Sequence, residues 1–321
     1  MLVCKPEGWG GAEIPVDLAG WREAIRDERV MEAVAAHCDT FHNLHVNLGD
    51  YRGVIPRTEA ASGIDTGKTK EIAILSRVGK PVCFRAVGFA PAGADAPGGP
   101  RILLSRRLAQ GGALALYRRH APPGTVIDAR VTHLENFGVF VDIGWGFGSF
   151  IGIENISVSR ISHPAERLRT GWDIKAVVTG TEEAAPGAPG RVLLSHKELL
   201  GTWAENAALF SPGETVPGIV RSVEDYGVFV ELRPNLSGLC EKNDRLREGE
   251  RIIVYIKSIQ PDRMKIKLNF IDTLPTGSPP ARPRYFLPEN GRLTHWRFAP
   301  ENCTGKGRET VFIDGAEPSS G

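Results

Sequence analysis

A segment of this chain occurs twice, and this internal repeat limits the possible folds more than any other feature. Residues 131–143 align without a gap to residues 220–232, so that Phe140 and Phe229 occupy the same place 89 positions apart (229 − 140). A Pro-Gly pair precedes each copy, at 123–124 and 212–213. A short apolar run closes each, at 191–195 and 265–269. Repetition at a fixed period predicts repeated small domains rather than one large one.

A more divergent copy precedes these two. Residues 38–49 align with 134–144, and the run 101–105 closes this copy as 191–195 closes the next. Three repeats therefore fill residues 28–272. The predicted domains are a lead segment (1–27), three repeats (28–110, 122–199 and 211–272), a linker helix between the last two (200–210) and a Pro-rich C-terminal tail (273–321).

The pattern within a repeat has the period of β-strands. Val139, Val141 and Ile143 alternate with Phe140 and Asp142, which places them on opposite faces of a strand. Five such runs, separated by turn residues, can be marked in the second repeat, near 125–134, 138–143, 149–154, 172–180 and 191–195. Five short strands suit a small closed barrel. The predicted fold class is mainly β: three tandem five-stranded barrels joined by short helical linkers.

The segments outside the strands give two further predictions. Leu199, Trp203, Ala207 and Phe210 recur at helical spacing, which predicts a linker helix within 196–210, and a second one is expected at 113–120. In the tail, prolines alternate with aromatic and basic residues, which predicts an extended and poorly packed segment.

Composition excludes several classes of protein. The sequence contains no 18-residue apolar run, and charged residues interrupt its first twenty positions, so we expect neither a membrane span nor a signal peptide. Its 5 cysteines are scattered without a CxxC, which argues against a disulfide framework or a zinc cage and favours the cytoplasm. The 39 basic and 38 acidic residues nearly cancel: counted from the sequence, the three repeats carry +3, −2 and 0.

The repeated motif resembles that of a known family. A Pro-Gly pair, a strand, an aromatic-Gly-Val-Phe-Val segment, a Gly-led third strand and a closing Arg/Lys-Ile/Val-x-Leu-Ser/Asn strand resemble the S1 (S-one) RNA-binding repeat of the OB-fold class. Three such repeats, with 155–164 and 194–200, resemble the bacterial small-subunit ribosomal protein S1 family. The resemblance implies OB-fold barrels that hold single-stranded messenger RNA at the small ribosomal subunit, without a cofactor, metal, membrane or small-molecule substrate.

The resemblance also implies the site residues. In this family two aromatic residues of the second strand and a basic residue that starts the last strand contact RNA; they map onto Phe137, Phe140 and Arg191, onto Tyr226, Phe229 and Lys265, and, in the first repeat, onto His42, His45 and Arg101. The histidine that the family often carries on the third strand is replaced, by Pro56, Gly152 and Glu241.

The strand pattern predicts the direction of the central aromatic residues. Phe140 and Phe229 share a strand face with Asp142 and Glu231, and unpaired carboxylates are costly to bury, so we expect this whole face to be exposed. Because the repeats carry little net charge, RNA affinity must depend on stacking of bases on these rings.

Enzyme and metal-site interpretations are weaker. Residues 63–69 resemble a phosphate-binding loop but have Ser62 where the motif needs glycine, and 144–148 lack the spacing of a dinucleotide-binding loop. His37, Cys38, His42 and His45 straddle two strands and a turn, which favours surface positions over a metal site. We therefore predict a non-enzymatic RNA-binding protein. An RNA-binding regulatory or RNA-turnover accessory protein acting off the ribosome stays open as an alternative, and the divergent first repeat could dock protein instead of RNA.

Overall fold

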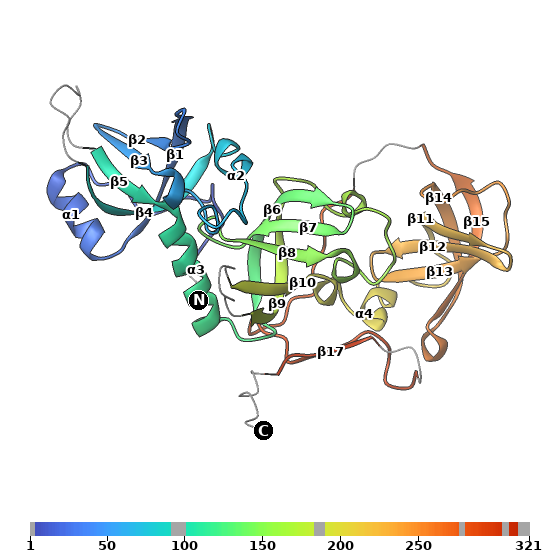
Figure 1. Ribbon diagram of the computed structural model, residues 1–321. Helices are drawn as coiled ribbons and strands as arrows, with labels where there is room; N and C mark the ends of the chain where they lie inside the picture. Colours follow the sequence, from blue (N-terminus) through green and yellow to red (C-terminus); the bar gives the residue numbers. More distant parts are fainter. Residues whose placement is uncertain (1–3, 91–100, 183–189, 276–279, 304–307, 314–321) are drawn as a thin grey trace.

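Three closed five-stranded barrels follow one another along the chain, coloured from blue through green to orange in Figure 1. The computed structural model describes residues 4–90, 101–182, 190–275, 280–303 and 308–313. The predicted fold class, mainly β with three tandem barrels, is confirmed.

The barrels share one topology. In each, the third and fifth strands pair in parallel and all other neighbours are antiparallel, which closes the sheet. The first barrel contains β1 (Val30–Cys38), β2 (Leu44–Leu48), β3 (Tyr51–Ile55), β4 (Pro81–Phe89) and β5 (Arg101–Ser105). The second contains β6 (Val126–Glu135), β7 (Gly138–Asp142), β8 (Gly148–Gly152), β9 (Asp173–Glu182) and β10 (Arg191–Ser195). The third contains β11 (Thr215–Glu224), β12 (Gly227–Arg233), β13 (Leu236–Cys240), β14 (Arg251–Gln260) and β15 (Lys265–Thr273).

Alternation of β-branched residues fills the interior of each barrel. In β7, Val139 and Val141 are fully buried in the core of the middle barrel, while Phe140 between them points outward. Ile151 of β8 and Val131 of β6 complete the same layer. The predicted parity of the strand is therefore confirmed for the valines and for Phe140.

The same irregularity recurs between the first two strands of every barrel. The register shifts by one residue at corresponding places: between Ala35 and His37, between Val131 and His133, and between Val220 and Ser222. A bulge bends its strand and increases the twist. Because it recurs in all three barrels, it makes His37, His133 and Ser222 structurally equivalent.

The helices begin and end differently from the prediction. Helix α3 spans Arg106–His120, earlier than the expected 113–120, and Ser105 caps it by accepting a hydrogen bond from the Leu108 N–H at 3.0 Å. The expected helix at 200–210 is shorter, because α4 spans only Trp203–Ala207. A 3₁₀ turn (Lys197–Leu200) precedes it, and Gly201 separates the two with a φ of +85°. Gly201 interrupts the helix because its backbone conformation is left-handed.

Further short elements flank the barrels. The helices are α1 (Leu18–Arg26), which precedes the first barrel, and α2 (Ile72–Leu75), between β3 and β4. The tail forms the two-stranded sheet of β16 (His295–Arg297) and β17 (Glu309–Val311). In the part of the chain that is described, no helix is both long and apolar enough to cross a membrane.

The prediction that the tail is poorly packed is wrong for its described residues. Trp296 and Phe312 are buried with Val177 and Leu199 in a cluster beside the middle barrel. The Leu293 N–H donates to the Gly124 carbonyl at 2.9 Å, and a Cβ on Gly124 would lie 1.8 Å from the Leu293 carbonyl oxygen. The tail aromatics thus bury apolar area that the repeats leave exposed, which the proline content alone could not reveal.

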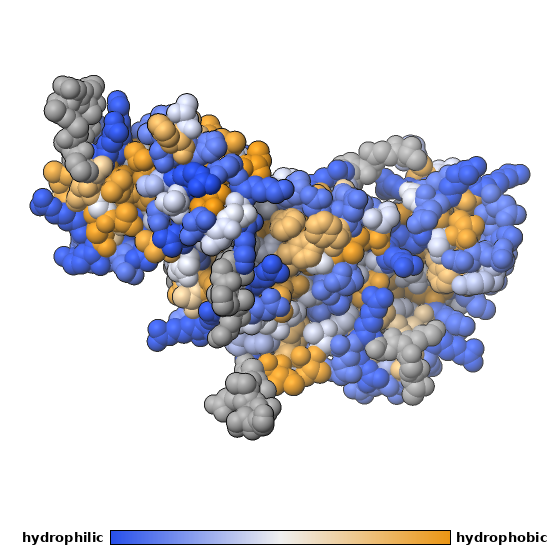
Figure 2. Space-filling view, in the orientation of Figure 1, coloured by the Kyte–Doolittle hydropathy of each residue, from blue (hydrophilic) through white to orange (hydrophobic). Residues whose placement is uncertain are grey.

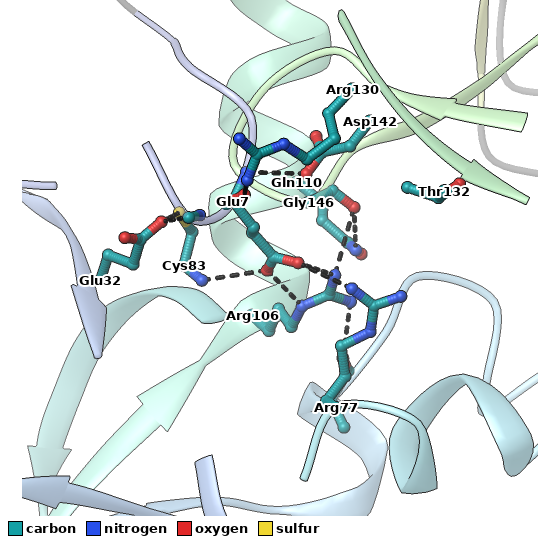
Figure 3. A network of polar contacts seen from close by, with 12 residues as sticks. Glu7, Glu32, Arg77, Cys83, Arg106, Gln110, Arg130, Thr132, Asp142 and Gly146 are labelled. Carbon is teal, nitrogen blue, oxygen red and sulfur yellow. Dashed lines mark hydrogen bonds and ion pairs between the residues drawn. The ribbon is translucent and has the colours of Figure 1, made fainter. Parts of the chain in front are cut away.

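Buried ion pairs fix the first barrel against the second (Figure 3). Glu7, in the segment that precedes α1, accepts hydrogen bonds from Arg106 Nε at 2.8 Å and from the Cys83 N–H at 3.0 Å, and it pairs with Arg77 at 3.1 Å. The Glu7 N–H in turn donates to Asp142 Oδ2 at 2.8 Å. Burial would raise the pKa of Glu7, but Arg106 and Arg77 hold it below its usual range. The carboxylate therefore stays ionised between its arginines.

A second buried network joins the middle and third barrels. Glu231 pairs with Arg167 of the loop between β8 and β9, and with Arg221 Nε of β11 at 2.8 Å. Asn235 Oδ1 accepts a hydrogen bond from the Val158 N–H at 2.9 Å, which adds a contact between the same two barrels. Buried pairs of this kind specify one arrangement of their partners, because separating them would leave an unpaired charge.

These networks overturn one expectation from the sequence. Asp142 and Glu231 were expected on an exposed face, but they are only 5% and 4% exposed. Each carboxylate is buried because a partner from a distant part of the chain satisfies it: the Glu7 N–H for Asp142, and Arg167 for Glu231. On this face, the ring in the middle of each strand, Phe140 in β7 and Phe229 in β12, is accessible to solvent, whereas the carboxylate two residues later is buried.

Candidate nucleic-acid interface

The aromatic residues predicted in the middle barrel lie together on its outer surface. Phe137 ends the turn between β6 and β7 and is 59% exposed, and Phe140, in the centre of β7, is 38% exposed. Their ring centroids lie 6.4 Å apart with the rings nearly perpendicular, at 87°. One ring thus presents its face where the other presents its edge, which leaves two differently oriented surfaces for flat ligands.

Gly138, between the two rings, explains the spacing of the motif. A Cβ on Gly138 would lie 2.3 Å from Phe150 Cζ and 2.4 Å from the Ile151 carbonyl oxygen of β8. Only glycine allows β8 to approach so closely. The glycine of the aromatic-Gly-Val-Phe motif is therefore needed for the packing of β7 against β8, and the aromatic residues of the motif form the exposed surface.

Two further aromatic residues join this face and were not among the predicted site residues. Phe140 lies opposite Phe150 of β8 and opposite His133 of β6. The ring centroid of Phe140 is 5.1 Å from that of Phe150 and 6.5 Å from that of His133. Alternation of Phe150 with the buried Ile151 could have revealed the first from the sequence. The sequence alone could not show that His133 lies opposite Phe140, because a bulge in β6 shifts the register between Val131 and His133.

Arg191 and Leu193 complete the face from β10. Leu193 pairs with Phe150 in parallel register and is exposed, and Arg191, two residues earlier on the same side of the strand, is exposed too. The cross-strand partner of Arg191 is the exposed Glu182 of β9, although among the described residues Arg191 takes part in no ion pair shorter than 4.0 Å. An exposed guanidinium of this kind is suited to binding a phosphate. Figure 2 shows an apolar patch on the middle barrel above β7 and β8.

The third barrel repeats the arrangement with two rings fewer, because Ser222 and Leu239 stand where the middle barrel has His133 and Phe150. Tyr226 is 69% exposed, Phe229 is half-buried, and their centroids lie 6.1 Å apart at 88°, nearly the geometry of Phe137 and Phe140. Phe229 lies opposite Leu239 of β13, where the middle barrel has a third ring. The exposed Lys265 starts β15. The predicted residues of this repeat therefore gather on one surface.

The predicted residues of the first barrel form a different surface. The rings of His45 and His37 stack at 4.3 Å with an interplanar angle of 3°. His45 Nε2 lies 3.1 Å from Asp39 Oδ2, and His42 Nδ1 lies 3.1 Å from Glu71 Oε2. Arg101, at the start of β5, is exposed.

The two carboxylates of this surface stay ionised. Hydrogen bonds from Asn43 hold the pKa of Asp39 well below its usual range, and a hydrogen bond from Arg57 lowers the pKa of Glu71. Anionic groups beside the imidazoles oppose the approach of phosphates, so this face is less suited to RNA than those of the other barrels.

The segments considered for other chemistry have structural roles. Residues 63–69 form turns in which the Thr69 N–H donates to the Gly63 carbonyl at 3.0 Å, and the helix that follows is a single turn. His37, His42 and His45 contact each other or carboxylates, and the described residues contain no group of three side chains suited to a metal ion.

An RNA-binding domain family and several ribosomal proteins are similar to this chain. Residues 121–188 match the S1 RNA-binding domain family. Over 76% of its length the chain is 28% identical to small ribosomal subunit protein bS1 of Leuconostoc lactis, of which it covers 55%. It is 31% identical to bS1 of Staphylococcus epidermidis over 47% of this chain and 41% of that protein. The chain thus spans about half the length of these curated relatives.

A relative with a different name shares only a small part of its own length. The 4-hydroxy-3-methylbut-2-enyl diphosphate reductase of Fusobacterium nucleatum is 34% identical over 45% of this chain, but the match covers only 18% of the reductase. The resemblance to the ribosomal protein S1 family that the repeats predicted is confirmed by these matches.

Proposed function

We propose that this chain, a relative of the bacterial ribosomal protein S1 family, binds single-stranded messenger RNA through its second and third barrels and holds it at the small ribosomal subunit in the cytoplasm. The observation that carries the proposal is the paired aromatic surface. Phe137 with Phe140, and Tyr226 with Phe229, present the same perpendicular geometry on two barrels. Exposed rings in a repeated arrangement suit bases, since each stacked base contributes roughly 1–3 kcal/mol.

A basic residue at the edge of each aromatic surface supports binding of the phosphate backbone of the RNA. Arg191 and Lys265 start the last strand of their barrels and are exposed. Each provides one positive charge beside the rings, while the repeats as a whole are nearly neutral. Stacking therefore supplies most of the affinity in this proposal, and the cations orient the phosphates.

The fixed contact between the two barrels supports binding of one continuous strand. Arg167 and Glu231 form a buried pair across the contact, and the Val158 N–H donates to Asn235. Because the two barrels are held in one arrangement, RNA bound to the middle barrel reaches the third barrel in an intramolecular step. The first barrel, whose histidines face carboxylates, is assigned to contacts with the ribosomal subunit rather than with messenger RNA.

Two measurements test the proposal. Titration of a labelled single strand and of its duplex should give clearly tighter binding to the single strand, because a duplex hides its base faces. Equal affinity for both would contradict the proposed surface. Sedimentation with purified small ribosomal subunits tests the partner: protein that binds the strand but stays in the supernatant would favour a regulatory or RNA-turnover role off the ribosome.

A further inference from the structure

We propose that Phe150 is a third base-stacking residue, which makes the middle barrel the tighter of the two RNA-binding barrels. This inference rests on the proposed function and adds a residue that the sequence motif did not assign. Phe150 lies in the centre of β8 and is half-buried, next to the fully buried Ile151.

The three phenylalanine rings of the middle barrel form one continuous surface. The ring centroid of Phe150 is 5.1 Å from that of Phe140, at 54°, and 5.5 Å from that of Phe137, at 40°. These separations are those of aromatic pairs in contact. A base that stacks on Phe140 or Phe137 therefore meets the Phe150 ring as its neighbour.

The fold itself does not require a ring at this position. The equivalent residues are Val54 in the first barrel, opposite His45, and Leu239 in the third, opposite Phe229. Leu239 covers Gly227 in the third barrel as Phe150 covers Gly138 in the middle one. An aliphatic side chain is thus sufficient to pack against the glycine, and the aromatic ring in the middle barrel needs another explanation.

The missing histidine of the third strand provides that explanation. Gly152 occupies its place, two residues after Phe150 and on the same side of β8. A Cβ on Gly152 would lie 2.4 Å from Glu154 Oε1, so the Glu154 carboxylate lies where a side chain at this position would begin. Phe150 places a ring two residues before this position, and it supplies a third flat surface where the histidine is absent.

The surroundings of Phe150 match a single strand. Leu193 continues the apolar row on β10, and the exposed Arg191 lies at its edge. His133, whose ring pairs with Glu135 at 2.8 Å, follows Phe140 on β6. A row of rings on three strands, continued by a leucine on a fourth and with a cation at its border, suits unstacked bases attached to a charged backbone. In the third barrel the same row reads Ser222, Phe229, Leu239 and Lys267, with only one ring.

Four variants of the full chain test the proposal. Phe150→Leu installs the residue of the third barrel, and Leu239→Phe makes the reciprocal change. Phe147→Leu is the matched control, because its ring is buried in the core of the same barrel. Phe140→Ala reports on the proposed function itself. The probe is a fluorescein-labelled oligouridylate of about 15 nucleotides, long enough for the site of one OB-fold barrel or more.

Phe150→Leu should weaken binding by about 5- to 20-fold, in the lower part of the range for one lost stack, because leucine keeps some apolar contact. Phe147→Leu should lower the melting temperature without changing the affinity of the folded protein. Leu239→Phe should tighten binding by about 3- to 10-fold. If Phe150→Leu also melts early, the Leu239→Phe result decides: a gain supports the proposal and no gain overturns it.

The outcomes separate the two proposals. If Phe140→Ala binds weakly but Phe150→Leu binds as the wild type does, the third stack does not exist and the proposed function stands. If the affinity changes with neither Phe140→Ala nor Phe150→Leu, both proposals are wrong.

Discussion

Replacing Phe140 by alanine should separate the binding role of the aromatic surface from its packing role. The residue is 38% exposed, so about three-fifths of it is covered. Complete burial of a phenylalanine contributes about 1.5–3 kcal/mol, and the covered part therefore contributes about 1–2 kcal/mol to the free energy of unfolding. Because the site is open to solvent, no enclosed cavity adds to this cost.

Val141→Ala is the control for this comparison, since it changes the next residue of β7 on the opposite face. Val141 is fully buried, and losing two of its carbons should destabilise the protein by about 2 kcal/mol, including the cavity left behind. The two variants should thus unfold at similar denaturant concentrations, both below that of the wild type.

RNA affinity should distinguish them. Phe140→Ala removes one stack and should weaken binding to a labelled single strand by roughly 1–3 kcal/mol, about 5- to 150-fold. Val141→Ala should leave the affinity of the folded protein unchanged. Urea unfolding and fluorescence anisotropy titration measure the two quantities. Weaker binding by Val141→Ala together with wild-type binding by Phe140→Ala would show that the faces of β7 are assigned backwards.

The remaining predictions concern salt, pH and Gly152 of β8. Few phosphates are neutralised, so the logarithm of the affinity should fall against the logarithm of salt concentration with a slope of about −1 to −3, at roughly −0.7 per phosphate; a slope steeper than about −5 in anisotropy titrations would assign the affinity to charge. Burial lowers the pKa of His196 from 6.5 to about 4, so the unfolded chain binds the proton first and stability should fall by about 2–3 kcal/mol as pH drops from 7 to 4.5. Urea midpoints check this, and a His196→Asn variant that keeps the whole pH dependence would refute the assignment. Gly152→His, at an ordinary φ of −61°, should displace the Glu154 side chain and tighten RNA binding about 3- to 10-fold; unchanged affinity would mean that this position of β8 is not part of the surface.

The sequence by itself determined the repeat, the strands and the direction of the central rings. Alternation along a strand is a local property: once Val139 and Val141 were assigned to the core, Phe140 had to point outward. The same holds for Phe229 in the third barrel. The five predicted runs of the second repeat lie within two residues of β6 to β10, because turn residues interrupt the pattern at each end.

The tertiary structure decided which side chains meet across strands and barrels. Phe150 joins Phe140 through the register of β8, and the bulge in β6 brings His133 to the same row. Asp142 and Glu231 are buried because Glu7 and Arg167, 135 and 64 residues away, satisfy their oxygens. The cost of burying a carboxylate depends on these partners, and periodicity within one strand contains no information about them.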